Sequence, residues 1–298
     1  MKTYVLYHAN CYDGFGAAWA AWKLLSNNAI YIPVSYGNPP PEIAPDSTVY
    51  LLDFSYPPEV LLSLANRVYH LTILDHHKTA QQDLADLGRP AHRFDVEVNP
   101  PGLYVKFDME ESGASLSWEY FYEQNSLVYK RVPSLIEYIK DRDLSRFDLQ
   151  YSEEISAWLH SHPLDFQLWD TLSYDLEDTD SFSRFWREGA AILRSRSRQI
   201  ESICRDPQWI ELGGIRVPCV NATTLFSECG DFLCREYPDA SPFAAYYFDR
   251  HDGKRQWGLH SRHGFDVSAI AKLYGGGGHA AAAGFTTICP PLMETSEE

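Results

Sequence analysis

The chain has 298 residues, of which 45% are hydrophobic and 14% aromatic, so we expect two folded domains and exclude disorder over most of the length. Its 41 acidic and 25 basic residues give a formal net charge of −16, which argues against binding of long duplex nucleic acid, because that partner requires a basic surface. The sequence has neither the roughly 20 apolar residues of a membrane helix nor a signal peptide at its start, and its six cysteines lack zinc-finger spacing, so we expect a reduced, cytoplasmic protein without a membrane partner.

Four short apolar runs predict β-strands in the first part of the chain, at residues 3–7, 29–34, 49–52 and 71–74. Three of these runs are followed directly by a side chain that can bind a metal ion: His8, Asp53 and Asp75. In a mostly parallel sheet the carboxyl ends of the strands form the ligand crevice. We therefore expect these side chains to lie close together.

Helices are predicted between and after these strands. Apolar residues at helical spacing between residues 15 and 25 predict a helix that begins just after the polar turn 8–13. Another helix is expected from Pro57 or Pro58, with Ser55 as its cap, which leaves Asp53 available for another role. Residues 113–121 predict an amphipathic helix with a packing role, and residues 182–204 predict a long connecting helix.

The chain after residue 204 has the pattern of a smaller domain. A hairpin is expected to turn at Gly213-Gly214, with further strands at residues 243–248 and 256–260 and a short helix at 266–273. We therefore predict an α/β fold: a parallel-sheet domain at residues 1–180, a linker helix at 181–204, and a mixed α+β domain at 205–298.

A run of four glycines, Gly275 to Gly278, precedes His279. Glycine permits positive φ angles and lets backbone N–H groups approach a ligand closely. At the N-terminus of a helix such groups bind anions. A flexible turn is the alternative interpretation, but the adjoining histidine favours phosphate binding.

Side chains that suit divalent first-row metals such as manganese are expected to cluster at the strand ends of the first domain: His8, Asp13, Asp53, Asp75, His76, His77 and Asp143. One carboxylate shared by two ions about 3.5–4 Å apart is typical of phosphoryl-transfer sites. Ordinary turn and surface residues are the alternative interpretation of each motif taken separately.

Asp75-His76-His77, together with Gly275 to His279 and the preceding segment 265–271, resembles the DHH phosphoesterase superfamily. The resemblance is closest to members with a DHH-associated C-terminal domain, such as RecJ-type nucleases, nano-RNases and small-nucleotide phosphatases. It covers nearly the whole chain, and the two motifs together are highly specific to the superfamily.

The resemblance implies a role for each candidate in the first domain. Asp53 would bridge two ions, His76 with Asp13 and Asp143 would bind one of them, and His8 would bind the other. Asp75 would support the metal-binding histidine, and His77 would face the scissile phosphate as a hydrogen-bond donor or acid. Asp141 is the alternative to Asp143 as a metal ligand.

Cys11 departs from the superfamily pattern. The first motif usually reads Asp-x-Asp-Gly, and here the same register gives Cys11-Tyr12-Asp13-Gly14. A thiolate at this position could bind a metal ion and would favour a softer one. Alternatively, this metal site is weak or empty.

The resemblance implies a metal-dependent phosphoesterase that hydrolyses short oligonucleotides or small nucleotides with water activated by two Mn²⁺ ions, Mg²⁺ or Co²⁺ being alternatives. The second domain would bind the substrate through Asn221, His260, Arg262, Gly275, Gly276, Gly277, Gly278 and His279, although many members have arginine at the position of His260. Two alternatives stay open: an inorganic polyphosphate hydrolase, and a nucleotide-binding sensor with a degraded metal site. A homo-oligomer is also left open.

Overall fold

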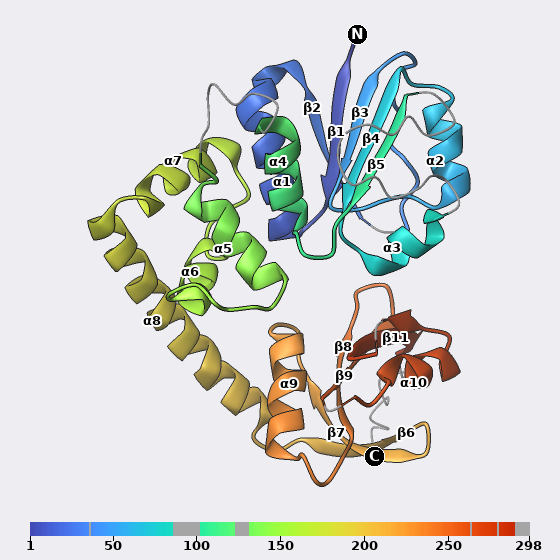
Figure 1. The fold of residues 1–298 in the computed structure, drawn as a ribbon. Helices are drawn as coiled ribbons and strands as arrows, with labels where there is room; N and C mark the ends of the chain where they lie inside the picture. The colour runs from blue at the N-terminus through green and yellow to red at the C-terminus, as the bar shows by residue number, and fades with distance from the viewer. Residues whose placement is uncertain (36, 86–101, 123–130, 263, 279, 290–298) are drawn as a thin grey trace, which may run out of the picture. The chain divides into compact units, whose positions relative to one another are not determined.

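The computed structural model describes residues 1–35, 37–85, 102–122, 131–262, 264–278 and 280–289 (Figure 1). The protein has an α/β fold, as predicted, and divides into two compact units, Met1–Ile192 and Leu193–Glu298. The division falls inside the long helix α8 (Thr179–Cys204). The domain boundaries expected at residues 180 and 204 bracket this helix and stay predictions.

The first unit is built on a five-stranded parallel sheet with the order β2-β1-β3-β4-β5. Its strands are β1 (Thr3–His8), β2 (Ile30–Val34), β3 (Thr48–Leu52), β4 (His70–Asp75) and β5 (Leu103–Phe107). The first four match the predicted apolar runs. Strand β5 was not predicted, because Lys106 interrupts its apolar pattern; the lysine is buried and its Nζ lies 2.5 Å from a carboxylate oxygen of Glu119.

Helices cover both faces of this sheet (Figure 1). Helices α1 (Tyr12–Leu25) and α4 (Gly113–Tyr122) pack on one face, and α2 (Pro58–Ala65) and α3 (Lys78–Asp83) lie on the other. Successive strand residues alternate between the two cores: Val5 packs with Trp19 of α1, and Leu6 packs with Leu61 of α2. The expected Ser55 cap of α2 is wrong, because the residue that caps this helix is Pro57 and no side chain accepts a hydrogen bond there.

Three further helices join the core on the α1 side. They are α5 (Ser134–Asp143), α6 (Ser152–Leu159) and α7 (Phe166–Leu176). Ile136, Trp158 and Trp169 bury their side chains in the same cluster as Trp19. This packing holds α5, whose last residue is Asp143, against the same hydrophobic core as α1.

The second unit contains a six-stranded sheet with the order β10-β11-β9-β8-β7-β6, in which only β7 and β8 pair in parallel. Its strands are β6 (Gln208–Leu212), β7 (Ile215–Asn221), β8 (Phe243–Asp249), β9 (Lys254–Ser261), β10 (Gly277–Gly278) and β11 (Ala282–Ile288). Helices α9 (Phe226–Glu236) and α10 (Val267–Leu273) pack into separate cores. The predicted hairpin is confirmed, with Gly213 and Gly214 at φ 59° and 78°.

The glycine run does not lie at a helix N-terminus, so that expectation is wrong. Gly275 and Gly276 follow the C-terminal end of α10, and Gly277 and Gly278 form the short strand β10. A Cβ atom on Gly276 would lie 2.1 Å from the carbonyl oxygen of Gly284, so this position requires glycine for close backbone packing. His279 lies outside the described residues.

None of the described helices is both long enough and apolar enough to cross a bilayer.

Candidate metal centre

The order of the strands places a ligand crevice between β1 and β3. The chain leaves β1 for β2 on one side and returns to β3 on the other, which makes this pair the switch point of the sheet. His8 is the last residue of β1, Asp53 directly follows β3, and Asp75 is the last residue of β4. Their side chains therefore start from the same edge of the sheet.

Asp53 lies at the middle of the site. Its Oδ1 is 3.1 Å from Nε2 of His76, and its Oδ2 is 3.4 Å from Nδ1 of His8. The residue is 1% exposed, and Oδ2 makes no hydrogen bond with the described residues. Burial of a charged oxygen without a hydrogen bond is costly, so this atom is suited to a cation that it would hold directly.

The first group of candidate ligands contains Asp13, His76 and Asp143, whose ligand atoms lie within 4.8 Å of one another. Nε2 of His76 is 3.6 Å from Oδ2 of Asp13 and 3.5 Å from Oδ2 of Asp143. The residues come from the first turn of α1, the loop after β4, and the end of α5. Two carboxylates and an imidazole are donors suited to a divalent first-row ion.

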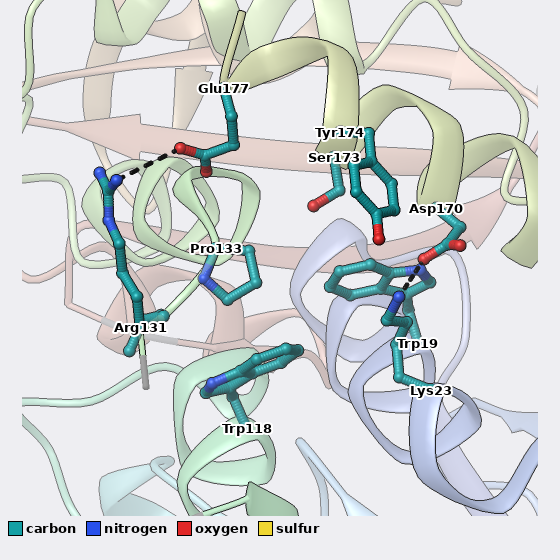
Figure 2. Close-up of a pocket in the computed structure, with 10 residues that line it drawn as sticks. Trp19, Lys23, Trp118, Arg131, Pro133, Asp170, Ser173, Tyr174 and Glu177 are labelled. Atoms are coloured by element: carbon teal, nitrogen blue, oxygen red, sulfur yellow. Dashed lines mark hydrogen bonds and ion pairs between the residues drawn. The ribbon is translucent and has the colours of Figure 1, made fainter. Parts of the chain in front are cut away.

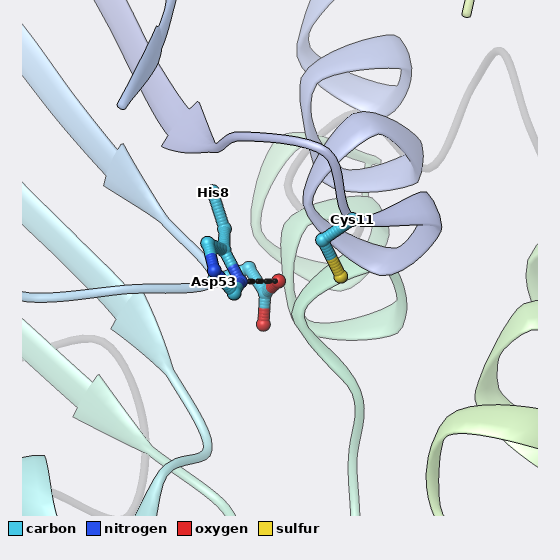
Figure 3. Close-up of side chains that lie close together, drawn as sticks. All are labelled: His8, Cys11 and Asp53. Carbon is cyan, nitrogen blue, oxygen red and sulfur yellow. Dashed lines mark ion pairs between the residues drawn. The ribbon is translucent and has the colours of Figure 1, made fainter. Parts of the chain in front are cut away.

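The second group contains His8, Cys11 and Asp53, and its ligand atoms also lie within 4.8 Å of one another. Figure 3 shows the three side chains converging from the end of β1, the start of α1 and the residue after β3. Asp53 is also close to His76 of the first group. The two groups are therefore arranged so that one carboxylate can serve both.

Burial and the neighbouring charges shift the pKa values of the carboxylates and of His76 in this site. Burial, and then the nearby Asp53 and Asp143, raise the pKa of Asp13 well above its ordinary value. Burial opposes ionisation of Asp53 too, but its contacts with His76 and His8 outweigh that effect and lower its pKa. Burial disfavours the charged form of His76, yet the hydrogen bond to Asp53 and the other carboxylates raise its pKa to about 9. Divalent ions at these groups would neutralise the same excess of negative charge, so the donor set fits two such ions.

Asp75 contacts His77 through one of its two carboxylate oxygens. Its Oδ1 accepts hydrogen bonds from the backbone N–H groups of His76 and His77, at 2.8 and 3.2 Å, and lies 2.7 Å from Nδ1 of His77. A carboxylate only accepts hydrogen bonds, so Nδ1 carries a proton. Burial disfavours the imidazolium of His77, but this hydrogen bond to Asp75 raises its pKa. His77 also lies near Asp53 and His76, so a role as a metal ligand is a second possibility.

The geometry favours Asp143 over Asp141 as a ligand. Asp141 is 5% exposed, and its carboxylate accepts hydrogen bonds from the backbone N–H of Asp148 at 2.9 Å and of Leu149 at 3.3 Å, and from the hydroxyl of Ser152 at 2.5 Å. These bonds fix the loop that follows α5. The role of Asp141 is therefore to fold this loop.

Cys11 offers a direct test of the second ligand group. Burial, and then the negative charge of Asp53, raise the pKa of this thiol, so a metal ion must displace its proton to bind. We expect Cys11→Asp to retain metal binding and shift the preference towards the harder ions Mn²⁺ and Mg²⁺. Cys11→Ala should weaken one of two bound ions by about tenfold or more.

Isothermal titration of the metal-free variants with Mn²⁺, Mg²⁺ and Co²⁺ measures both effects. Titrations of wild type and both variants that cannot be distinguished would show that Cys11 is only a turn residue.

The second unit brings two of the predicted substrate residues together. Nε of Arg262 donates a 2.6 Å hydrogen bond to Oδ1 of Asp231, and Nε2 of His260 lies 3.7 Å from the same oxygen. Asp231, on α9, is half-buried and was not predicted, because a single helical carboxylate carries no distinguishing sequence signal. Asn221 is exposed at the end of β7.

A cavity of about 290 Å³ elsewhere in the first unit contains none of the predicted residues (Figure 2). Trp19, Trp118 and Tyr174 contribute aromatic surface, and its charged groups pair with one another. Nζ of Lys23 lies 2.5 Å from Oδ1 of Asp170, and Nη1 of Arg131 lies 3.6 Å from Oε2 of Glu177. With its charges paired and no cluster of ligands, this cavity lacks the chemistry found at the sheet edge.

No protein-family model matches the sequence. The chain is 28% identical over 302 residues to an uncharacterized protein of Acanthamoeba polyphaga mimivirus; the match covers 94% of this chain and 66% of the viral protein, so the chain spans just under two thirds of that relative's length. Among solved structures, a pGpG-specific phosphodiesterase from Vibrio cholerae is similar with a TM-score of 0.49 and 13% identity, covering 97% of this chain and 94% of that one. RecJ from Thermus thermophilus, solved with Mn²⁺, gives a TM-score of 0.48 and 11% identity, covering 95% of this chain and 49% of RecJ.

Proposed function

We propose that the protein is a metal-dependent phosphoesterase of the DHH superfamily, acting on short oligonucleotides or small nucleotides in the cytoplasm. The observation that supports this most is the position of Asp53, which is buried between two ligand groups and near a histidine of each. A shared carboxylate of this kind is the defining part of a two-metal phosphoryl-transfer site. The motifs Asp75-His76-His77 and Gly275 to Gly278 support the same assignment.

In the proposed reaction Asp53, Asp13, His76 and Asp143 would hold one Mn²⁺ ion, and Asp53, His8 and Cys11 would hold the other. The ions would supply a nucleophilic water and neutralise charge on the phosphate. The protein itself supplies the orientation of these ligands and a proton donor. His77 fills that role, since Asp75 engages its Nδ1 and proton donation to the leaving group falls to Nε2.

The substrate is predicted to be short. The chain carries 41 acidic and 25 basic residues, so a long polyanion gains little from the surface beyond the metal centre. A short substrate carries only a few phosphates, whose charge the proposed metal ions would neutralise. We therefore expect the rate of hydrolysis per 3′ or 5′ end to fall by about tenfold or more, about 1.4 kcal/mol, between a dinucleotide and a twenty-mer.

In the decisive experiment, metal-free protein is loaded with Mn²⁺ and its hydrolytic activity is measured. The substrates are end-labelled oligonucleotides from dimer to twenty-mer, inorganic polyphosphate and a model phosphodiester. Fast hydrolysis of the shortest oligonucleotides is the expected result. Equal rates across the series, or processive degradation of the longest, would refute the short-substrate proposal. Hydrolysis of polyphosphate alone would reassign the substrate, and nucleotide binding without any hydrolysis would identify a sensor.

A further inference from the structure

The N-terminus of α4 contacts Asp13 and Asp53, two buried carboxylates of the proposed metal centre. The backbone N–H of Gly113 donates a 2.6 Å hydrogen bond to Oδ2 of Asp13, and the N–H of Ala114 donates a 2.9 Å bond to Oδ1. Asp13 is 3% exposed, so these bonds replace the water that its carboxylate would otherwise bind. The N–H groups of Gly113 and Ala114 belong to the first turn of α4, where backbone donors have no acceptor within the helix.

The same helix end presses against Asp53. A Cβ atom built on Gly113 would lie 2.5 Å from Cβ of Asp53 and 2.8 Å from its Cγ and Oδ1. The first of these atoms sits at the base of the side chain, so it moves only with the backbone of Asp53. That backbone is itself constrained, with a left-handed φ of 62° and an N–H that donates to the carbonyl oxygen of Leu74 at 2.9 Å.

The helix end is held in place by contacts that do not involve the site. The N–H of Ser112 donates to the hydroxyl of Ser115 at 2.9 Å, and the N–H of Ser115 lies 3.3 Å from the hydroxyl of Ser112, a reciprocal cap. Further along, the hydroxyl of Tyr122 donates to the carbonyl oxygen of Ala20 and ties α4 to α1. The position of α4 is therefore fixed by contacts other than those with Asp13 and Asp53, so the helix can support the two carboxylates.

We propose that Gly113 is a positioning residue of the metal centre: its missing side chain lets the start of α4 fix Asp13 and Asp53 at once, so that each carboxylate presents its outer lone pairs to a cation. Any side chain at this position displaces Asp53 from the point between the two ligand groups. This inference rests on the proposed function for its metal ions, but the contact with Asp53 is a property of the metal-free protein. Nothing in the motif Asp75-His76-His77 or in the glycine run points to Gly113.

The first measurement is Mn²⁺ binding to the metal-free full chain by isothermal titration. Gly113→Ala should lower Mn²⁺ affinity by about tenfold or more. The control is Ser117→Ala, one turn further along α4, where a buried hydroxyl without a hydrogen bond among the described residues is removed; it should bind as wild type does. Affinity of Gly113→Ala equal to wild type would overturn the inference.

The second measurement separates positioning from general packing of α4. The change in Tm caused by Gly113→Ala is compared in the native background and in an Asp53→Gly background, without metal. We expect a fall of about 5 °C or more in the first and no fall in the second, since Asp53→Gly removes the atoms that the new Cβ meets. Equal falls in both backgrounds would overturn the inference, and so would failure of both Gly113→Ala proteins to fold. Absence of Mn²⁺ binding by wild type would instead refute the proposed function. The Tm comparison would still test the contact between position 113 and Asp53, because it is made without metal.

Discussion

Asp53→Asn is expected to lower kcat for the best oligonucleotide substrate by about 10³-fold or more, equivalent to about 4 kcal/mol of transition-state stabilisation. The amide keeps the shape of the side chain but removes the charge that both proposed ions share. Asparagine also tolerates the left-handed φ of 62° at this position, which alanine does not, so the backbone should be retained. Loss of a shared ligand should separate or release the metal pair.

The readouts are kcat, the Mn²⁺ content after dialysis, and the Tm of the metal-free protein. Asp83→Asn is the matched control, because it removes the same charge from an exposed position at the end of α3 in the same unit. Mn²⁺ at a hundred times Kd should stabilise the folded wild type by about 2.7 kcal/mol and so raise its Tm, and the rise for Asp53→Asn should be smaller. Turnover and metal content of Asp53→Asn close to those of wild type would rule out the two-metal centre.

The candidate site residues of the first unit could be grouped from the sequence because three of them stand at the ends of predicted strands. His8, Asp53 and Asp75 each follow an apolar run, and parallel strands bring such ends to one edge. The preference for Asp143 over Asp141 came from the resemblance, and the structure adds a physical reason: the carboxylate of Asp141 accepts hydrogen bonds from the loop that follows α5. The identity of the ions is a matter of chemistry that neither the spacing nor the fold decides.

Contacts between distant segments could not be predicted in the same way. Residues 113–121 were expected to form a packing helix, and they do, but the hydrogen bonds from its first turn to Asp13 cross about a hundred residues of sequence. The pattern Ser112-x-x-Ser115 signals a helix start, without saying what that start faces. Asp231, which engages Arg262, was missed for the same reason.

The local structure of the glycine run differs from one of its two sequence interpretations. The sequence allows an anion-binding helix N-terminus or a flexible turn at Gly275 to Gly278. The structure instead uses Gly276 for close contact with Gly284 and pairs Gly277 and Gly278 with β11. Binding of phosphate by this segment therefore stays a prediction, and its backbone donors would be those of a strand at the edge of the sheet.

The pair formed by Asp75 and His77 predicts two different kinetic losses. His77→Gln removes the proposed acid, and we expect kcat to fall by about 10²- to 10⁴-fold with little change in KM. Asp75→Asn keeps an oxygen that can accept from Nδ1 of His77 and from the two backbone N–H groups, but it loses the charge that favours the imidazolium. Its kcat should therefore fall less than that of His77→Gln, and the double variant should resemble His77→Gln, because Asp75 acts through the histidine.

Metal content distinguishes this role from that of a ligand. If His77 is the acid, His77→Gln should bind Mn²⁺ with wild-type affinity while turnover is lost. If it is instead a ligand grouped with Asp53 and His76, the affinity should fall together with kcat. The control is His70→Gln, which changes the same residue type at the opposite end of β4 and should leave both quantities unchanged. Turnover of His77→Gln within about tenfold of wild type would exclude His77 as the proton donor, since general acid catalysis contributes more than that.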